Sequence, residues 1–361
     1  MKERRTRRNI LKSGAAAGMA FVSGCGHSQS QQPETGTVEQ PALFPESGLW
    51  PWSPPGLVER DLTPGNTPIR LACFHGKYMM NYPTDESITE VIKRVREAGY
   101  TSTNSSMPAN QRNPWLDAPE SDIIELRDAL NTYDVTYCDV HAYMNNIHPD
   151  MSQRQKNWRH VAEQVEVAAR VGSPLVTTQT GSVSPVSAVT FHELNWTEET
   201  WKTSVKAITQ ILKDTAGMPV DLAIEALNCI NVNNPVAHKR LRDDIGDPRV
   251  KVCLDPTNMI NFNTYGRTSE LIDACFEILG EDIIVAHAKD SLITPNKMSA
   301  YFTQAIPGTG VIDYELYLAH LSRMYYTRSL LIEHLALEDY PQAKAFIEQT
   351  AARVGVKIFG A

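Results

Sequence analysis

The sequence predicts a single (β/α)8 barrel, the TIM-barrel fold, over residues 66–361. Eight short apolar runs alternate with amphipathic helical patterns in this region, which is typical of βα units that build a parallel sheet. Its roughly 300 residues are enough for one large α/β domain. A doubly wound open sheet is the alternative, but no glycine-rich nucleotide loop follows the first apolar run.

Residues 1–24 are interpreted as an export signal that is not part of the fold. The segment TRRNILK at residues 6–12 resembles the twin-arginine (Tat) export motif, and the uncharged stretch after it is too short to span a membrane. The segment VSGC resembles a lipoprotein cleavage box, so Cys25 is the expected lipidation site. We therefore expect an exported, lipid-anchored protein of the periplasm. Gly26 after the cysteine favours the outer membrane of a Gram-negative bacterium.

Residues 25–65 are predicted to form a tether, because Pro, Gln, Ser and Gly are frequent there. The chain has 34 Lys and Arg against 42 Asp and Glu, a formal net charge of −8, and no basic cluster outside the signal. This charge disfavours nucleic-acid binding. Five cysteines besides Cys25 form no CxxC pair and lie mostly in strand-like runs, which indicates buried thiols rather than disulfides.

The apolar runs give the expected strands of the barrel in chain order. They are Ile69–Cys73, Tyr100–Asn104, Val135–His141, Leu175–Thr178, Val220–Glu225, Val250–Asp255, Ile283–His287 and Leu330–Glu333. Apolar stripes at helical spacing predict helices within residues 88–98, 158–169, 201–212 and 271–279, and a less regular helix after Asp313. The carboxyl ends of all strands meet at one rim of such a barrel, where its active site lies.

The last four strands each end on a side chain that can bind a metal ion. These side chains are Glu225, Asp255, His287 and Glu333. Any one of them could simply be solvated, cap a helix or lie in the core. Together they would place three carboxylates on one rim, where the carboxylates would repel one another unless a cation lay among them. The pattern therefore predicts a site for one divalent ion, and these ligand types do not distinguish Mn²⁺, Mg²⁺, Co²⁺ and Zn²⁺.

The segments IEALN, LDPTN, HAKD, PGTGVIDY and LIEHL, in this order, resemble the xylose-isomerase-like TIM-barrel superfamily over residues 68–356. This superfamily includes sugar phosphate isomerase/epimerase-like proteins, ketose 3-epimerases, inosose dehydratases and endonuclease IV. The resemblance implies Glu225, Asp255, His287 and Glu333 as metal ligands, and the two glutamates as the catalytic acid/base pair. Many members have a histidine where this chain has Asn258. Endonuclease IV uses that histidine and others for a zinc cluster, so a DNA-repair role is disfavoured.

The leading hypothesis is a metal-dependent sugar isomerase or epimerase that acts on a keto-sugar or related polyol through a metal-stabilised enediolate. Glu225 and Glu333 would remove and return the proton. An exported enzyme meets free sugars and glycosides rather than sugar phosphates, so the alternative is a lyase or dehydratase that acts on 3-keto-glycosides or inososes by β-elimination. A sugar-binding lipoprotein without catalysis is the third hypothesis. The sequence leaves a homo-oligomer open.

Other polar residues near the strand ends are candidate substrate contacts. They are His141, Gln179, Asn228, Asn258 and Lys289. Asn258 is expected to bind a substrate hydroxyl or to orient a metal ligand. For Lys289, an internal ion pair with Asp290 is the alternative.

The segment IPGTGVIDY contains two glycines, Gly308 and Gly310, between the last two predicted strands. Such a loop either binds a phosphate, as in some barrels of this type, or forms a plain turn before the helix that begins near Asp313. The sequence does not decide between them.

Overall fold

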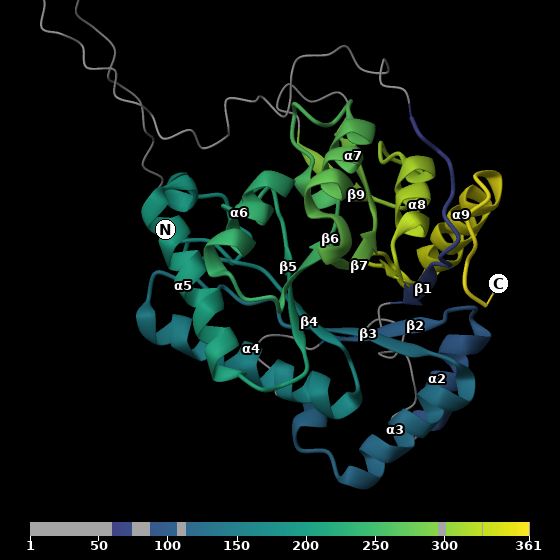
Figure 1. The fold of residues 1–361 in the computed structure, drawn as a ribbon, viewed down its shortest axis with the longest axis horizontal. Helices are drawn as coiled ribbons and strands as arrows, with labels where there is room; N and C mark the ends of the chain where they lie inside the picture. The colour runs from purple at the N-terminus through teal and green to yellow at the C-terminus, as the bar shows by residue number, and fades with distance from the viewer. Residues whose placement is uncertain (1–59, 74–86, 107–112, 295–300, 327, 361) are drawn as a thin grey trace, which may run out of the picture. The chain divides into compact units, whose positions relative to one another are not determined.

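The computed structural model describes residues 60–73, 87–106, 113–294, 301–326 and 328–360, and the predicted export signal and Cys25 lie outside them. The described strands form a closed barrel in the order β1-β10-β7-β6-β5-β4-β3-β2, and all neighbours are parallel (Figure 1). The barrel strands are β1 (Arg70–Cys73), β2 (Ser102–Ser106), β3 (Thr136–His141), β4 (Leu175–Thr178), β5 (Asp221–Glu225), β6 (Val250–Leu254), β7 (Ile283–Ala288) and β10 (Ser329–Ile332). The predicted (β/α)8 barrel and its eight strands are therefore confirmed.

Helices connect the strands, and their apolar faces pack on the outside of the barrel. They are α2 (Ile88–Glu97), α3 (Glu120–Tyr133), α4 (Met151–Val171), α5 (Glu198–Asp214), α6 (Pro235–Ile245), α7 (Thr268–Leu279), α8 (Tyr314–Arg323) and α9 (Tyr340–Arg353). The helical stripes of the sequence correspond to α2, α4, α5, α7 and α8. The prediction missed α3, α6 and α9. In α6, for example, only Pro235, His238 and Leu241 are buried, which is too few apolar positions for a clear helical stripe.

The interior of the barrel is layered by the two-residue repeat of the strands. Leu175, Ala223, Cys253 and Val285 form one buried apolar cluster from four neighbouring strands. Side chains two residues further along each strand point the same way, one layer closer to the carboxyl rim. This repeat raises Glu225, Asp255 and His287 above the apolar layer as buried polar residues.

A two-stranded antiparallel sheet, which the sequence did not predict, follows the carboxyl end of β7. It consists of β8 (Asp290–Ile293) and β9 (Phe302–Ala305), and Asp290 pairs with Ala305 at its base. β9 has no fully buried residue, so it lacks the apolar run that marks a core strand. The hairpin extends the rim above His287.

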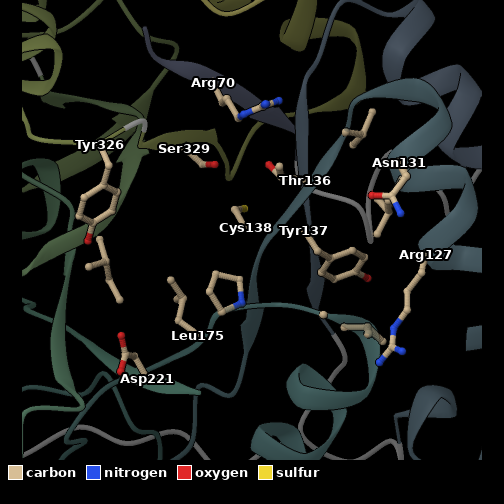
Figure 2. Close-up of a pocket in the computed structure, with 16 residues that line it drawn as sticks. Arg70, Arg127, Asn131, Thr136, Tyr137, Cys138, Leu175, Asp221, Tyr326 and Ser329 are labelled. Atoms are coloured by element: carbon tan, nitrogen blue, oxygen red, sulfur yellow. The ribbon is translucent and has the colours of Figure 1, made fainter. Parts of the chain in front are cut away.

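The amino-terminal ends of the strands border a pocket of about 600 Å³ (Figure 2). Its lining includes the first residues of five strands: Arg70, Thr136, Leu175, Asp221 and Ser329. The metal-binding candidates lie at the opposite ends of the strands. In barrels of this kind the amino-terminal rim contributes to stability, so this pocket is not the candidate active site.

The segment that enters the barrel runs along α8. Arg60 pairs with Asp313, and the Gly65 N–H donates to Ser322 Oγ at 2.9 Å, so residues assigned to the tether already contact α8. Of the cysteines in the described part, Cys73, Cys138, Cys253 and Cys275 are buried free thiols, as predicted, and Cys229 is free but only half-buried. No described helix has the length and apolarity that a membrane span requires.

We expect buried His238 to make the fold sensitive to acid. Its Nε2 lies 2.8 Å from the Ile224 carbonyl, and burial lowers its pKa from 6.5 to about 4. His238 therefore binds a proton more readily in the unfolded chain than in the folded protein. Stability should fall as the pH drops below about 6.5, and the loss should be complete near pH 4, amounting to roughly 3 kcal/mol.

Urea unfolding at several values between pH 7 and pH 4.5 measures this dependence. His238→Leu should give a flatter profile than the natural protein, whatever its stability at pH 7. Two parallel profiles would contradict the assignment.

Candidate metal centre

The structure brings the four predicted ligands together at the carboxyl rim. One donor atom from each of Glu225, Asp255, His287 and Glu333 lies within 4.8 Å of the other three, and all four residues are buried. His287 Nδ1 is 3.4 Å from Glu225 Oε1, 3.3 Å from Glu333 Oε1 and 3.9 Å from Asp255 Oδ2. Four strands thus aim a carboxylate or an imidazole at one point.

Neighbouring groups fix the orientation of Asp255 and Glu225. Asp255 Oδ1 accepts the N–H groups of Thr257 and Asn258 at 2.9 and 3.3 Å, which turns Oδ2 toward the other ligands. Pro256 starts the short turn that presents these N–H groups. Asn258 Nδ2 donates to Glu225 Oε1 at 2.7 Å, so Asn258 orients a candidate ligand, one of the two roles expected of it.

Hydrogen bonds below the rim hold His287. Cys253 Sγ lies 3.3 Å from Nε2, so that Nδ1 is the imidazole nitrogen that faces the carboxylates. The Tyr317 hydroxyl donates to the carbonyl groups of Leu254 and His287 and ties the ends of β6 and β7 to α8. Such outer contacts commonly fix ligand geometry at a metal site.

Lys289 is the cation closest to the carboxylates in the described part of the chain. It is 2% exposed, and its Nζ lies 2.8 Å from Asp255 Oδ2 and 2.7 Å from Glu333 Oε1. The alternative of an ion pair between Lys289 and Asp290 is therefore wrong. When His287 is neutral, as a metal ligand must be, three carboxylates and one ammonium group leave two negative charges, which one divalent ion would balance.

The pKa values of the three carboxylates are shifted in different directions: two are lowered and one is raised. Burial raises the pKa of each, but attraction to His287 and Lys289 outweighs burial and lowers the pKa of Glu225 to about 2 and that of Glu333 well below its usual range. Burial prevails at Asp255 and raises its pKa to about 6. The pKa of His287 is raised well above 6.5, because negative neighbours outweigh its burial.

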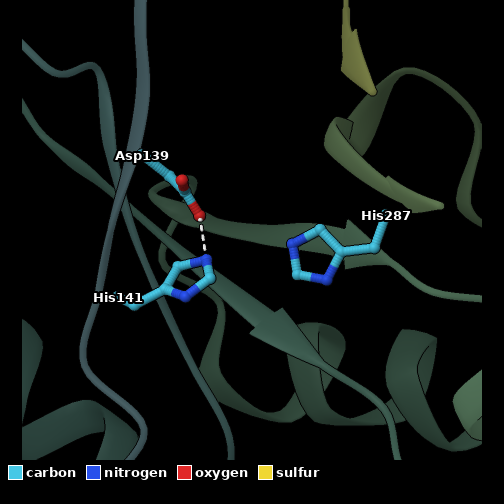
Figure 3. A group of neighbouring side chains, drawn as sticks. All are labelled: Asp139, His141 and His287. Carbon is cyan, nitrogen blue, oxygen red and sulfur yellow. Dashed lines mark ion pairs between the residues drawn. The ribbon is translucent and has the colours of Figure 1, made fainter. Parts of the chain in front are cut away.

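His141, the candidate from strand three, belongs to a buried His–Asp pair beside the centre (Figure 3). Its Nε2 is 2.9 Å from Asp139 Oδ2, and its ring centroid is 5.7 Å from that of His287. Thr177 Oγ1 donates to the same Asp139 oxygen at 2.7 Å. Asp139 was not among the residues predicted from the sequence, although its place two residues before His141 on one strand was the available signal.

Tyr143, which follows β3, adds a phenol group to the centre. Its hydroxyl is buried close to the carboxylates of Glu225 and Glu333. Burial and the nearby charge of Glu225 raise its pKa well above 10, so the group stays protonated. A protonated phenol beside two carboxylates is suited to donate a hydrogen bond to a bound oxygen atom.

The structure leaves two candidate substrate contacts without a direct link to the four ligands. Gln179 is buried after β4, where its backbone carbonyl accepts from Asn146 Nδ2 at 2.7 Å. Asn228 is exposed, and its Nδ2 donates to the Ile260 carbonyl at 2.6 Å, which joins the connections after β5 and β6. Their roles as substrate contacts stay predictions.

Asp290 fills the glycine-rich loop with its own carboxylate. Its Oδ2 accepts the N–H groups of Gly308 and Gly310 at 3.0 Å each, and its Oδ1 accepts that of Ile312 at 3.0 Å. A Cβ on Gly310 would lie 2.2 Å from Asp290 Oδ1, which explains a glycine there. The loop is thus a turn closed by an internal anion, and these N–H groups are not free to bind a phosphate.

The residues present fit a divalent metal ion. Oxygen and imidazole donors are those that such ions bind. Among the described residues, the buried Glu333 Oε2 lacks a hydrogen-bond partner, and so does Asp255 Oδ2 apart from its ion pair with Lys289. Buried carboxylate oxygens rarely stay unsatisfied. A metal ion would satisfy both atoms.

A closed parallel barrel with a cluster of candidate metal ligands at its carboxyl rim defines a class of TIM-barrel proteins. Residues 92–350 match the family model described as xylose isomerase-like TIM barrel, and the chain belongs to this family. No curated protein sequence matches the chain significantly.

Solved structures share the fold at low sequence identity. One is an IOLI protein with a bound zinc atom (TM-score 0.59, 16% identity, 81% of this chain and 100% of that chain covered). Another is endonuclease IV from Thermus thermophilus, with a TM-score of 0.57 and 14% identity over 79% of this chain and 99% of that chain. A third is the 3-keto-D-glucoside 4-epimerase YcjR from E. coli, with a TM-score of 0.54 and 16% identity over 80% of this chain and 99% of that chain. Identities this low establish the fold and not a reaction.

Replacing Lys289 should destabilise the protein most when no metal ion is supplied. In Lys289→Met the buried carboxylates lose their covalently attached counter-charge, which should lower the free energy of unfolding by roughly 3–5 kcal/mol in a chelator. Saturating Mn²⁺ should recover much of this loss. Denaturant titrations with EDTA and with Mn²⁺ measure both values.

Lys251→Met is the matched control, because Lys251 Nζ pairs with Asp282 Oδ1 at 2.8 Å in a partly exposed position. We expect a change of less than about 1 kcal/mol in both media. Equal losses for Lys289→Met with and without Mn²⁺ would contradict the metal-balancing role.

Proposed function

We propose that the protein is a metal-dependent isomerase or epimerase that acts on a keto-sugar or a related polyol. The observation that carries the proposal is the convergence of Glu225, Asp255, His287 and Glu333 on one point of the carboxyl rim. These four residues would hold one divalent ion. When bound, the ion would polarise a substrate carbonyl and stabilise the negative charge that develops as a neighbouring C–H bond breaks.

Glu225 and Glu333 are the proposed acid/base pair. Both carboxylates have lowered pKa values and are therefore charged at neutral pH, as a base must be before it takes a proton. They project from β5 and from the end of β10, on either side of β6 and β7. One glutamate would remove the proton from carbon, and the other would return a proton from its own side.

The remaining residues would bind and orient the sugar. Tyr143 would donate its hydroxyl proton to a substrate oxygen, and the His141 imidazole, held by Asp139, would contact a hydroxyl group. Lys289 would keep its charge between Asp255 and Glu333 and so help to keep both carboxylates ionised. The similarity to a 3-keto-D-glucoside 4-epimerase supports a keto-sugar substrate class.

The alternative is β-elimination by the same residues. If a leaving group stands next to the carbon that loses its proton, removal of that proton expels the group and no second proton transfer to carbon is needed. The export signal proposed for residues 1–24 favours this alternative, because an exported enzyme meets glycosides and oxidised glycosides. An unsaturated, UV-absorbing product with release of aglycone or water would identify a lyase.

Deuterium exchange tests the proton transfer. We expect the Mn²⁺-loaded protein in D₂O to place deuterium on the carbon next to the carbonyl of a ketose or 3-keto-glycoside. Glu225→Gln and Glu333→Gln should each lower the exchange rate at least about 100-fold, because an amide cannot accept the proton. NMR of the substrate pool measures exchange, and metal analysis of each variant shows whether the ion is retained.

Glu198→Gln is the control, since Glu198 forms an exposed ion pair with Arg240 on the outside of the barrel. It should leave exchange unchanged. Product formation without deuterium incorporation would exclude the proposed proton transfer.

A further inference from the structure

An exposed aromatic group stands on the same rim as the metal centre. The Phe262 and Phe302 rings pack with centroids 4.8 Å apart, and Tyr265 lies 5.9 Å from Phe302. Phe262 is nonetheless 64% exposed, and nearby Tyr301 is 54% exposed. Exposed aromatic rings held together in this way are typical of a surface that binds something.

Two neighbouring connections place this aromatic group beside the candidate ligands. Phe262 lies in the connection that follows β6 and Asp255, and Phe302 begins β9 of the hairpin that follows β7 and Lys289. The Tyr265 hydroxyl accepts the Ile293 N–H at 3.1 Å and so joins the two connections. The aromatic group therefore has a fixed position on the rim.

A polar contact continues from the aromatic group to the metal centre. Gln304 lies two residues after Phe302 on β9, so the two side chains share one face of the hairpin, about 7 Å apart along the strand. The Gln304 amide contacts His334 Nδ1 at 3.0 Å, and His334 Nε2 is 3.6 Å from Glu333 Oε1. His334 and Gln304 are both exposed, so a ligand can reach them.

The backbone conformation of His334 also indicates that this residue belongs to a binding site. His334 has a φ of 57°, and a residue other than glycine rarely adopts this left-handed conformation. Directly after a candidate metal ligand, this conformation turns the imidazole toward Gln304 instead of away from the rim. Strained backbone of this kind persists where the surroundings hold it and is frequent at binding sites.

We propose that Phe262, Phe302, Gln304 and His334 form a subsite for the group attached to the reacting sugar, so that the substrate is a glycoside. A pyranose ring has C–H groups on its faces and hydroxyl groups around its edge. An aromatic platform beside an amide and an imidazole matches both features. The subsite rests on the proposed function, because it places the reacting ring at the metal centre and the second ring or aglycone on the aromatic platform.

Binding of unreactive glucosides tests the subsite without turnover. With Mn²⁺-loaded protein, NMR titration should show phenyl β-D-glucopyranoside binding about 3- to 10-fold more tightly than methyl β-D-glucopyranoside. Phe262→Ala should abolish most of this difference and leave the methyl glucoside unchanged. Gln304→Ala should weaken the binding of cellobiose, because the second ring of cellobiose carries hydroxyl groups. The same substitution should leave the affinity for the phenyl glucoside nearly unchanged.

Phe191→Ala is the matched control. Phe191 is 69% exposed and packs on Trp196 with centroids 4.8 Å apart, but it lies in the connection between β4 and α5. It should keep the preference for the phenyl glucoside. An equal loss in Phe191→Ala and Phe262→Ala would overturn the assignment to this platform.

The remaining outcomes separate the subsite from the proposed function. If both glucosides bind the natural protein equally, the subsite is wrong, while deuterium exchange still decides the function. If neither glucoside binds, the subsite is wrong as well, and deuterium exchange on a ketose or 3-keto-glycoside alone decides the proposed function. Sedimentation velocity tests whether the aromatic group is instead an interface between two copies of the chain. If Phe262→Asp turns a dimer into monomers and the preference for the phenyl glucoside persists, the group is such an interface and not a sugar subsite.

Discussion

The mutual repulsion of three buried carboxylates is the constraint on which this structure depends. Glu225, Asp255 and Glu333 lie within a few ångströms of one another, and each would be costly to bury alone. Two features offset this cost. Lys289 is a permanent cation between two of them, and the imidazole of His287 faces all three. When His287 is neutral, as a metal ligand must be, three carboxylates and Lys289 leave two negative charges, which one divalent ion would balance. Such an ion would also give Glu333 Oε2 the partner that it lacks among the described residues.

The layered interior of the barrel explains why the cluster forms at this height. Apolar side chains fill the layer below, and the two-residue period of each strand turns the next inward position into a carboxylate or an imidazole. Glu225 pairs with Cys253, two residues before Asp255, and His287 pairs with Leu331, two residues before Glu333. Because the strands of a barrel are tilted and staggered, these offsets bring the four groups to the same level. Tyr317 on α8 adds hydrogen bonds to the carbonyl groups of two of these strands, which limits their movement. A rigid scaffold of this kind suits a metal site, because ligand geometry decides metal affinity.

The sequence predicted the barrel and the convergence of four ligands because both depend on local patterns. Apolar runs mark buried parallel strands, and a polar residue at the end of such a run marks the rim. Contacts between segments far apart in the chain have no such local signal. Neither the Gln304–His334 contact nor the ion pair from Lys289 to Glu333 could be inferred, because each depends on how connections fold over the rim. The helix α9 was missed for another reason: its buried face consists largely of alanine and polar residues, which give a weak periodic pattern.

The two glutamates of the centre are held differently, and this difference bears on the direction of proton transfer. Glu225 Oε1 accepts from the amide of Asn258, a neutral donor, whereas Glu333 Oε1 accepts from the ammonium group of Lys289. A charged donor stabilises a carboxylate more than a neutral one does, so Glu333 is the weaker base. Where a histidine at the position of Asn258 could add a ligand or a proton carrier, an amide can hydrogen-bond its partner but carries no proton at neutral pH. Glu225 is thus the better candidate for the first proton removal from carbon. Glu333 lies beside His334 and the hairpin, so it is better placed to act on the side of a bound sugar that would face the aromatic platform.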